Sequence, residues 1–437
     1  MYLTNRFFWF AGAVIALFSL SYPSDWLFPL AQIALAALII LTAADIFILF
    51  YRRPEITAHR SVAPVFSLGD PNPLAINLEN RSSMSLHASI TDELPAQFQI
   101  RDFSMSRWLA PGEKYRLEHK LIPLSRGIYR FGHINVFITT RLGLAERRLK
   151  EGLREEIRVY PSIIQMKRFE LRATRQIAHE TGVKKMRRLG HSYEFEQIKS
   201  YVPGDDYRSV NWKASGRKGA IMVNQYEDER SQQIYCLIDK SRVMRMPFEG
   251  LSLMDYAINT SLAISNIILK KQDKAGLITF SDVIGATIKA ERKAGQLNKI
   301  LEALYKEKER KGEANYELMY EAMSRLINVR SLLLLFTNFE SHYALERALP
   351  TLRRLNRQHL LVVVFFENTE IRKLAGEPVE KTIDIFRQTI ARQFLLDKRE
   401  MVYKLRQYGI QAVLTRPQDL TLNTINKYLE LKSRGLI

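Results

Sequence analysis

The sequence predicts a multi-domain protein: an N-terminal transmembrane helical hairpin, then an antiparallel β-sandwich, and finally a doubly wound α/β domain. Three patterns predict this order. Two apolar runs lie within the first 51 residues, strand-like alternation continues to about residue 160, and apolar runs alternate with helical patterns beyond residue 231. We expect a hairpin at 1–53, a β-sandwich at 54–160, a basic linker with a signature segment at 161–230, and an α/β domain at 231–437.

The two N-terminal runs have the length and composition of membrane-inserted helices. The run 26–51 contains one charged residue, Asp45, and exceeds the ~20 residues that cross a bilayer. The run 7–20 is shorter and spans only if Leu3 and Tyr22 contribute at its ends. A cleaved signal peptide is the alternative. We favour a retained hairpin because no small-residue cleavage site separates the two runs.

The charges that flank the hairpin predict its orientation. Arg6 precedes the first run, Arg52 and Arg53 follow the second, and the connection carries only Asp25. Positively charged flanks stay on the cytoplasmic side, so we expect both termini and the soluble body on the cytoplasmic side of the inner (cell) membrane. Asp45 lies within a turn or two of this interface, where its side chain can snorkel to water.

The body is strongly basic. The chain carries a net charge of +19 and its first 51 residues carry −1, so the rest carries +20. Anionic lipid headgroups would attract such a body by ~1 kcal/mol for each basic residue near the surface. Few aromatic residues lie among the cations of 162–190, so a nucleic-acid partner is not expected and a solvated linker is the alternative. The cations of this strip are Lys167, Arg168, Arg172, Arg175, Lys184, Lys185, Arg187 and Arg188.

Residues 55–160 alternate apolar and polar side chains with a period of two. The alternation is clearest around Ile76, Leu117 and Val136, and turn residues separate these stretches. About 100 residues of this kind are typical of an immunoglobulin-like sandwich. No catalytic pattern occurs here, so we interpret the domain as a spacer or docking module.

Five short apolar runs mark the C-terminal domain. They are 234–238, 275–280, 331–336, 360–366 and 410–414. Helical patterns alternate with them, including one from Met254 to Leu269 and one from Ile383 to Phe394 that ends at Gly409. This alternation predicts a parallel sheet covered on both faces. The lone cysteine, Cys236, lies inside the first run, which indicates a buried structural thiol.

Oxygen-bearing side chains follow two of these runs. Asp239 and Ser241 follow the first and Asn338 follows the third, where ligands of such sheets bind. The pattern resembles the metal-ion-dependent adhesion site of the von Willebrand factor type A fold, which holds a divalent cation. Val243 replaces the second serine of that site, Asn338 replaces an aspartate, and Asn315 stands where a threonine is expected. We therefore favour a metal-free loop, with Mg²⁺ or Mn²⁺ as the alternative.

The segment before the α/β domain is the most distinctive. It comprises the stretches 193–198, 201–214 and 225–229, with a Pro-Gly-Asp-Asp turn, a Trp-Lys-Ala segment and an acidic strand end. This signature resembles the domain of unknown function 58 family, whose members are membrane proteins with a type A-like domain. The resemblance extends over nearly the whole chain, from the hairpin to the α/β domain.

Two interpretations of the signature stay open. In the structural one, Asp205 or Asp206 caps a helix and Trp212 anchors that helix to a core. In the functional one, a mixed-charge surface binds a partner protein. The residues of that surface are Asp205, Asp206, Arg208, Trp212 and Lys213.

The motifs favour a binding protein. The chain has no Gly-x-Ser-x-Gly, His-Glu-x-x-His or Walker A motif and no Cys/His cluster, so we expect neither an enzyme nor a resident cofactor. The family resemblance implies a membrane-anchored adaptor that works with a MoxR-type AAA+ ATPase and other type A-domain proteins. The process implied is assembly or maturation of envelope or metal-dependent complexes. The alternative is a metal-dependent adhesion or ligand-binding protein, followed by a hydrolase or a nucleic-acid binder.

Overall fold

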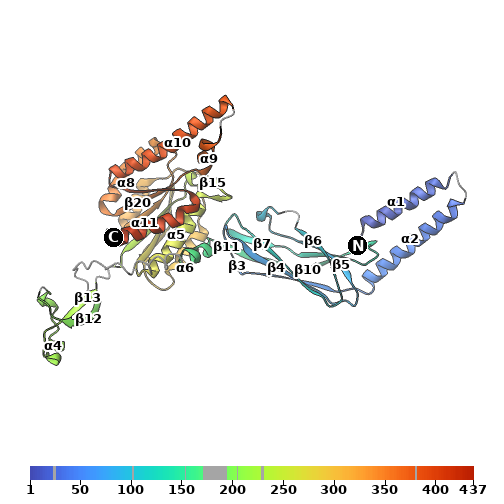
Figure 1. Ribbon diagram of the computed structural model, residues 1–437, viewed down its shortest axis with the longest axis horizontal. Helices are drawn as coiled ribbons and strands as arrows, with labels where there is room; N and C mark the ends of the chain where they lie inside the picture. The colour runs from blue at the N-terminus through green and yellow to red at the C-terminus, as the bar shows by residue number, and fades with distance from the viewer. Residues whose placement is uncertain are drawn as a thin grey trace. The chain divides into compact units, whose positions relative to one another are not determined.

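The computed structural model describes residues 1–22, 26–100, 103–152, 154–170, 194–203, 205–227, 231–378 and 381–437. The chain forms two compact units, Met1–Ser162 and Ile163–Ile437 (Figure 1). Most of the basic strip predicted at 162–190 falls at 171–190, outside the described residues.

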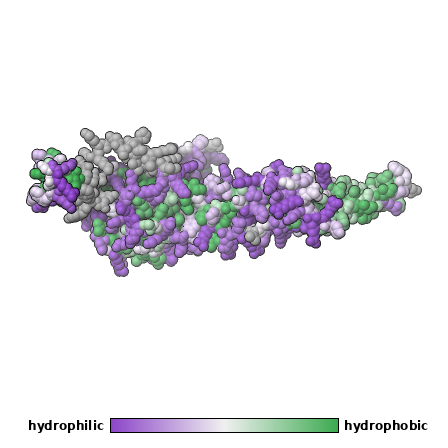
Figure 2. Space-filling model, turned by 90° about the horizontal axis from the view of Figure 1, so that it is seen from below, coloured by the Kyte–Doolittle hydropathy of each residue, from purple (hydrophilic) through white to green (hydrophobic). Residues whose placement is uncertain are grey.

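The first unit begins with two apolar helices, α1 (Asn5–Leu20) and α2 (Leu27–Phe50). The helices lie side by side, with the rings of Phe18 and Phe28 6.1 Å apart (Figure 1). Their exposed apolar side chains form the large green region of Figure 2. Among the described helices, α2 alone is long and apolar enough to cross a membrane. This points to membrane association, and the predicted two-span topology stays a prediction.

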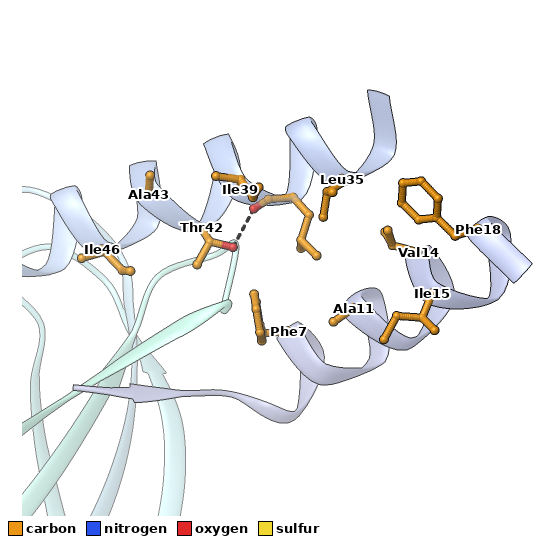
Figure 3. A pocket seen from close by; sticks show the side chains of 11 residues that line it. Phe7, Ala11, Val14, Ile15, Phe18, Leu35, Ile39, Thr42, Ala43 and Ile46 are labelled. Atoms are coloured by element: carbon orange, nitrogen blue, oxygen red, sulfur yellow. Dashed lines mark hydrogen bonds between the residues drawn. The ribbon is translucent and has the colours of Figure 1, made fainter. Parts of the chain in front are cut away.

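A groove of about 580 Å³ lies between α1 and α2 (Figure 3). Phe7, Ala11 and Phe18 line it from α1, and Leu35 and Thr42 are among the residues that line it from α2. The hydroxyl of Thr42 donates to the carbonyl of Leu38 within its own helix, at 2.7 Å. The groove is therefore lined by apolar side chains, and the one hydroxyl from Thr42 is already paired. Such a surface can face lipid.

The rest of the first unit consists of β-sheets, as the alternation predicts. Five strands pair in the order β1-β10-β9-β5-β6, and three-stranded sheets have the orders β2-β4-β7 and β3-β11-β8. All these pairings are antiparallel except β3 with β11. Alternate side chains such as Ile76, Ile90 and Val136 are buried. The immunoglobulin-like assignment stays a prediction.

The bounds of these strands are β1 Tyr2–Leu3, β2 Ile56–Val62, β3 Val65–Ser67, β4 Asn72–Asn80, β5 Leu86–Asp92, β6 Ser104–Leu109, β7 Lys114–Leu121, β8 Gly127–Phe131, β9 Ile134–Thr139, β10 Ala145–Glu151 and β11 Glu155–Tyr160. A 3₁₀ turn, η1, covers Ala96–Phe98. The N-terminal strand β1 pairs with β10, so residues at the start of α1 are tied into the largest sheet of the unit.

Asp45 connects α2 to the β-sheet part of the first unit, which we call the β-body. Its carboxylate accepts hydrogen bonds from the backbone N–H of Leu144 at 2.8 Å and of Ala145 at 2.9 Å, and from the hydroxyl of Thr140. The side chain is fully buried. The snorkelling predicted for Asp45 is therefore wrong, because protein donors take the place of water around the carboxylate. Arg147 adds a bond to the carbonyl of Leu49 at 2.9 Å.

The second unit is built on a six-stranded sheet with the order β18-β17-β14-β19-β20-β21. Five strands are parallel, and β18 pairs antiparallel at one edge. The five parallel strands match the five predicted apolar runs. Their bounds are β14 Gln233–Asp239, β17 Lys274–Phe280, β19 Leu332–Phe336, β20 Leu360–Phe366 and β21 Gln411–Thr415, and β18 covers Ile284–Glu291.

Helices cover both faces of this sheet, as predicted. One face packs on α5 (Leu253–Lys270), α6 (Gln296–Lys306) and α11 (Leu420–Ser433). The other packs on α7 (Tyr316–Leu326), α8 (His342–Gln358) and the second half of α10 (Thr382–Gln407). Neighbouring side chains of β14 alternate between the two cores: Cys236 enters the first and Leu237 the second. Cys236 is a free, buried thiol, as the sequence indicates.

Smaller elements complete the unit. They are α9 Thr369–Gly376, β15 Pro247–Phe248, β16 Leu251–Ser252, η3 Arg242–Met244 and η4 Pro417–Asp419. The signature segment forms a small lobe of its own, which we call the signature lobe: β12 Glu194–Ser200, η2 Tyr207–Ser209, α4 Trp212–Lys218 and β13 Met222–Glu227. Strands β12 and β13 pair antiparallel.

Candidate functional site

The carboxyl ends of β14 and β19 bring the predicted oxygen ligands close together. Because Ile238 pairs with Phe336, the residues that follow the two strands are neighbours. One carboxylate oxygen of Asp239 accepts the backbone N–H of Ser241 at 2.8 Å, and the other accepts the hydroxyl of Thr337 at 2.7 Å. Asp239 and Ser241 therefore meet as predicted, with Thr337 as an additional partner.

The Asp239 carboxylate is buried and held by protein donors. Burial raises its pKa, and the hydrogen bonds from Ser241 and Thr337 oppose that rise. Thr337 also lies 2.8 Å from the hydroxyl of Tyr316 on α7, which extends the chain of polar contacts. The hydroxyl oxygen of Ser241 is buried without a hydrogen-bond partner among the described residues.

The side chain of Asn338 points toward the ammonium of Lys398. This lysine reaches in from α10, where it is 6% exposed, and donates to the side-chain oxygen of Asn338 at 2.9 Å and to the carbonyl of Phe339. Burial lowers the pKa of Lys398 to about 8. Asn338 thus lies at a strand end next to that of Asp239 and Ser241, as predicted. Its amide oxygen, however, accepts a hydrogen bond from a lysine.

The two other positions of the adhesion-type pattern have structural roles here. Asn315 caps α7 by accepting the backbone N–H of Leu318 at 3.0 Å. Val243 lies in η3 and packs against the first core. A second buried ammonium, that of Lys240, pairs with Glu307 at 2.8 Å. This edge of the sheet therefore contains two buried lysine ammonium groups, those of Lys240 and Lys398.

A cavity of about 100 Å³ opens beside Lys398 at this edge of the sheet. Its walls are mainly apolar, and the polar groups around it include Asn338, Glu340 and Glu367. The apolar walls come from η3 and its neighbours, β20, α9 and α10; they are Met246, Phe248, Leu253, Phe366, Ile371, Phe394 and Leu395. A small apolar group with a polar end would suit such a space.

The first half of α10 carries an uncovered apolar stripe. The helix runs past the edge of the sheet (Figure 1). In its second half Met401 and Leu405 pack into the core, whereas in its first half Phe386 is 64% and Ile390 66% exposed. The predicted helix is confirmed, but only half of its apolar face covers the sheet. We call the exposed side chains the α10 stripe: Ile383, Phe386, Ile390 and Phe394.

The carboxylates of the signature lobe organise its backbone. Asp205 accepts the ammonium of Lys199 at 2.7 Å and the backbone N–H of Val202 at 3.0 Å. Asp206 caps η2 by accepting the N–H of Arg208 at 3.0 Å. The helix cap predicted for this pair is thus found at η2, and Asn211 caps α4.

Two aromatic side chains of the signature lobe, Tyr207 and Trp212, face outward. Trp212 is 77% exposed and Tyr207 72% exposed, with the guanidinium of Arg208 5.8 Å from the Tyr207 ring. The predicted anchoring of α4 to a core by Trp212 is therefore wrong. In a lobe of two strands and one short helix, no described neighbour covers this ring.

We call Asp239, Ser241, Asn338 and their polar partners at the carboxyl ends of β14 and β19 the strand-end site. Sequence reasoning missed three of its residues: Thr337, Tyr316 and Lys398. Thr337 directly precedes Asn338, so its place at the strand end was open to prediction. Lys398 gave no signal, because a lysine within a charged helix ordinarily faces water. Tyr316 follows a helix cap and reads as an ordinary core residue.

Comparisons with known proteins agree with the signature. The family described as "Protein of unknown function DUF58" matches residues 197–375, which confirms the resemblance over that segment. The uncharacterized protein YeaD of Bacillus subtilis is 26% identical over 161 residues, which is 37% of this chain and 38% of the length of YeaD. The chain thus matches well under half of that relative.

Solved structures give only distant likenesses. The CARDB domain of the PF1109 protein from Pyrococcus furiosus, solved with di-metal ions, is 15% identical, with a TM-score of 0.19 over 24% of this chain and 93% of that domain. Proximal thread matrix protein 1 from the mussel byssus is 12% identical, with a TM-score of 0.28 over 46% of this chain and 45% of that protein. The type A-like assignment stays a prediction.

Proposed function

We propose that this protein is a membrane-anchored adaptor that binds a partner protein through the signature lobe. The observation that carries the proposal is the exposure of Trp212 and Tyr207 in a lobe where the carboxylates of Asp205 and Asp206 bind backbone N–H groups of the lobe itself. Tryptophan, tyrosine and arginine are the residues that most often dominate protein interfaces. Exposed apolar surface rimmed by polar side chains often marks such an interface.

The charges of the lobe favour an acidic partner surface. Three exposed cations, Arg208, Lys213 and Arg217, outnumber the exposed carboxylate of Asp206, and Asp205 is half-buried and paired with Lys199. Of the residues predicted to bind a partner, Arg208, Trp212 and Lys213 therefore make direct contact in this proposal. Asp205 and Asp206 hold the lobe in shape.

The family resemblance supplies the class of partner. We propose a MoxR-type AAA+ ATPase, with other type A-domain proteins as clients or co-factors of assembly. The α2 helix would hold the adaptor at the inner membrane, with the body in the cytoplasm. The +20 charge of the body favours anionic headgroups as neighbours. No catalytic step is assigned to the chain.

A second candidate is metal-dependent ligand binding at the strand-end site, in an α/β unit of von Willebrand factor type A kind. One observation favours it: the hydroxyl of Ser241 is buried beside the Asp239 carboxylate and makes no hydrogen bond of good geometry within the part of the chain that the structure describes. Mg²⁺ or Mn²⁺ at millimolar concentration should then raise the melting temperature of the protein, and Asp239→Asn should remove that rise. An unchanged melting temperature would count against the candidate.

Capture experiments test the adaptor proposal. The full chain in detergent, with an affinity tag, is incubated with a MoxR-type ATPase, and the bound fraction is measured for wild type, Trp212→Ala and Tyr207→Ala. We expect both variants to lose at least tenfold in affinity. Trp108→Ala is the matched control, because Trp108 is also exposed, at 45%, but lies on β6. Equal capture by all four proteins would refute the assignment to the lobe.

A further inference from the structure

Three metal-ligating side chains meet where α8 and α10 approach each other. His342 is the first residue of α8, directly after its cap Ser341. Asp397 and Glu400 lie three residues apart on α10, so both project from the same side of that helix. One ligand atom from each of the three lies within 4.8 Å of the others.

The imidazole of His342 is aimed at the two carboxylates. Its Nε2 atom lies 3.2 Å from a carboxylate oxygen of Glu400 and is shielded from solvent, and it makes no hydrogen bond of good geometry among the described residues. The His342 side chain as a whole is 36% exposed and that of Glu400 is 69% exposed, so a metal ion can reach the cluster from solvent. Asp397 is oriented by Gln393, whose amide donates to its carboxylate at 2.8 Å. A hydrogen bond of this kind to one carboxylate oxygen fixes the direction in which the other oxygen points.

A neighbouring ion pair lies beside the cluster. Glu346 lies one turn after His342 on α8, and its pKa is lowered chiefly by a hydrogen bond from Lys404, with His342 contributing. Because Glu346 is paired with Lys404, the carboxylates of Asp397 and Glu400 are the two that meet the imidazole of His342.

We propose that His342, Asp397 and Glu400 bind a transition-metal dication, for which Zn²⁺ is the best probe. An imidazole nitrogen with two carboxylate oxygens suits Zn²⁺ and related ions better than Mg²⁺, which prefers oxygen ligands alone. Three protein ligands leave one position for water or for a carboxylate of another molecule. The bound ion joins α8 to α10, the helix that carries the α10 stripe. This site is separate from the strand-end site and does not depend on the proposed function.

Metal titration of the full chain in detergent tests the proposal. Zn²⁺ binding is measured by calorimetry, and Co²⁺ binding by its visible absorption, for wild type, His342→Ala and Glu400→Gln. We expect wild type to bind one more equivalent of Zn²⁺ than His342→Ala, and Glu400→Gln to weaken that equivalent at least tenfold. Zn²⁺ bound by the other histidines of the chain is the same in all these proteins, so it cancels when their stoichiometries are compared.

His59→Ala is the matched control, because His59 is an exposed histidine on β2. It should keep the full stoichiometry and the Co²⁺ spectrum. We also expect Zn²⁺ to raise the melting temperature of wild type more than that of His342→Ala, and Mg²⁺ to raise neither. Equal Zn²⁺ stoichiometry in wild type and His342→Ala would overturn the proposal, and would leave the His342–Glu400 contact as an ordinary ion pair.

Discussion

The bond between Asp45 and the β-body is the contact whose loss should be most visible. Asp45→Ala removes an acceptor that serves two backbone N–H groups, those of Leu144 and Ala145, and the hydroxyl of Thr140. The substitution leaves both N–H groups buried beside α2 with no acceptor. The expected result is local opening of the segment that connects β9 with β10, while the sheets themselves stay folded.

The magnitude follows from the number of donors left unpaired. Each buried N–H without a partner costs about 1–3 kcal/mol, and removing the buried carboxylate returns part of this because its desolvation cost disappears. We take the net cost as about 3 kcal/mol, which corresponds to a roughly hundredfold larger open population. Asp45→Asn keeps an acceptor oxygen and should open the segment only about tenfold.

Hydrogen exchange of the full chain in nanodiscs measures this directly. Peptides that contain Leu144 and Ala145 should exchange about a hundredfold faster in Asp45→Ala than in wild type. Thr42→Ala is the control on the same helix, because the hydroxyl of Thr42 bonds only within α2 among the described residues. Exchange at Leu144 and Ala145 that is the same in wild type and Asp45→Ala would refute the reasoning.

Three further predictions concern the second unit. Burial raises the pKa of Cys236 to about 12, so Ellman's reagent at pH 8 should label this thiol only in denaturant. Lys398 has its pKa lowered to about 8 in the fold, so the native state binds fewer protons than the unfolded state between pH 8 and 10.5, and stability should rise with pH there. Urea unfolding should show about 3 kcal/mol of this rise in wild type and none in Lys398→Met. Glu307→Gln removes the charge that pairs with Lys240 and should destabilise by about 3 kcal/mol. Lys240→Met combined with Glu307→Gln should recover most of that loss in the same assay, because the glutamine keeps an acceptor oxygen for Thr279 and Ala286.

The strands of the α/β unit were predictable because burial on both faces leaves an unbroken apolar run. Each of the five runs is a strand, and the helices between them lie on both faces. Strand β18 was missed because it lies at the edge, where one face meets water and its side chains alternate from Ile284 to Glu291. An apolar run in a sequence also does not show whether an edge strand pairs parallel or antiparallel.

The polar residues were harder to predict, since their partners are distant in sequence. Asp45 looked like a carboxylate that reaches for water, yet its donors lie about a hundred residues later. Lys398 looked solvent-facing, yet its partner Asn338 lies 60 residues earlier. Trp212 was expected in a core, and the signature lobe offers it none. In each case the sequence specifies the group and only the fold specifies what surrounds it.

The α10 stripe has a thermodynamic consequence. Met401 and Leu405 belong to the core while Ile390 lies on the same helix outside it, so covering the stripe enlarges the core that already stabilises the sheet. Binding and folding are then linked: a partner present at a hundred times its dissociation constant would add about 2.7 kcal/mol to the free energy of unfolding. The abundance of this protein in a cell would then depend on the concentration of whatever molecule covers the α10 stripe.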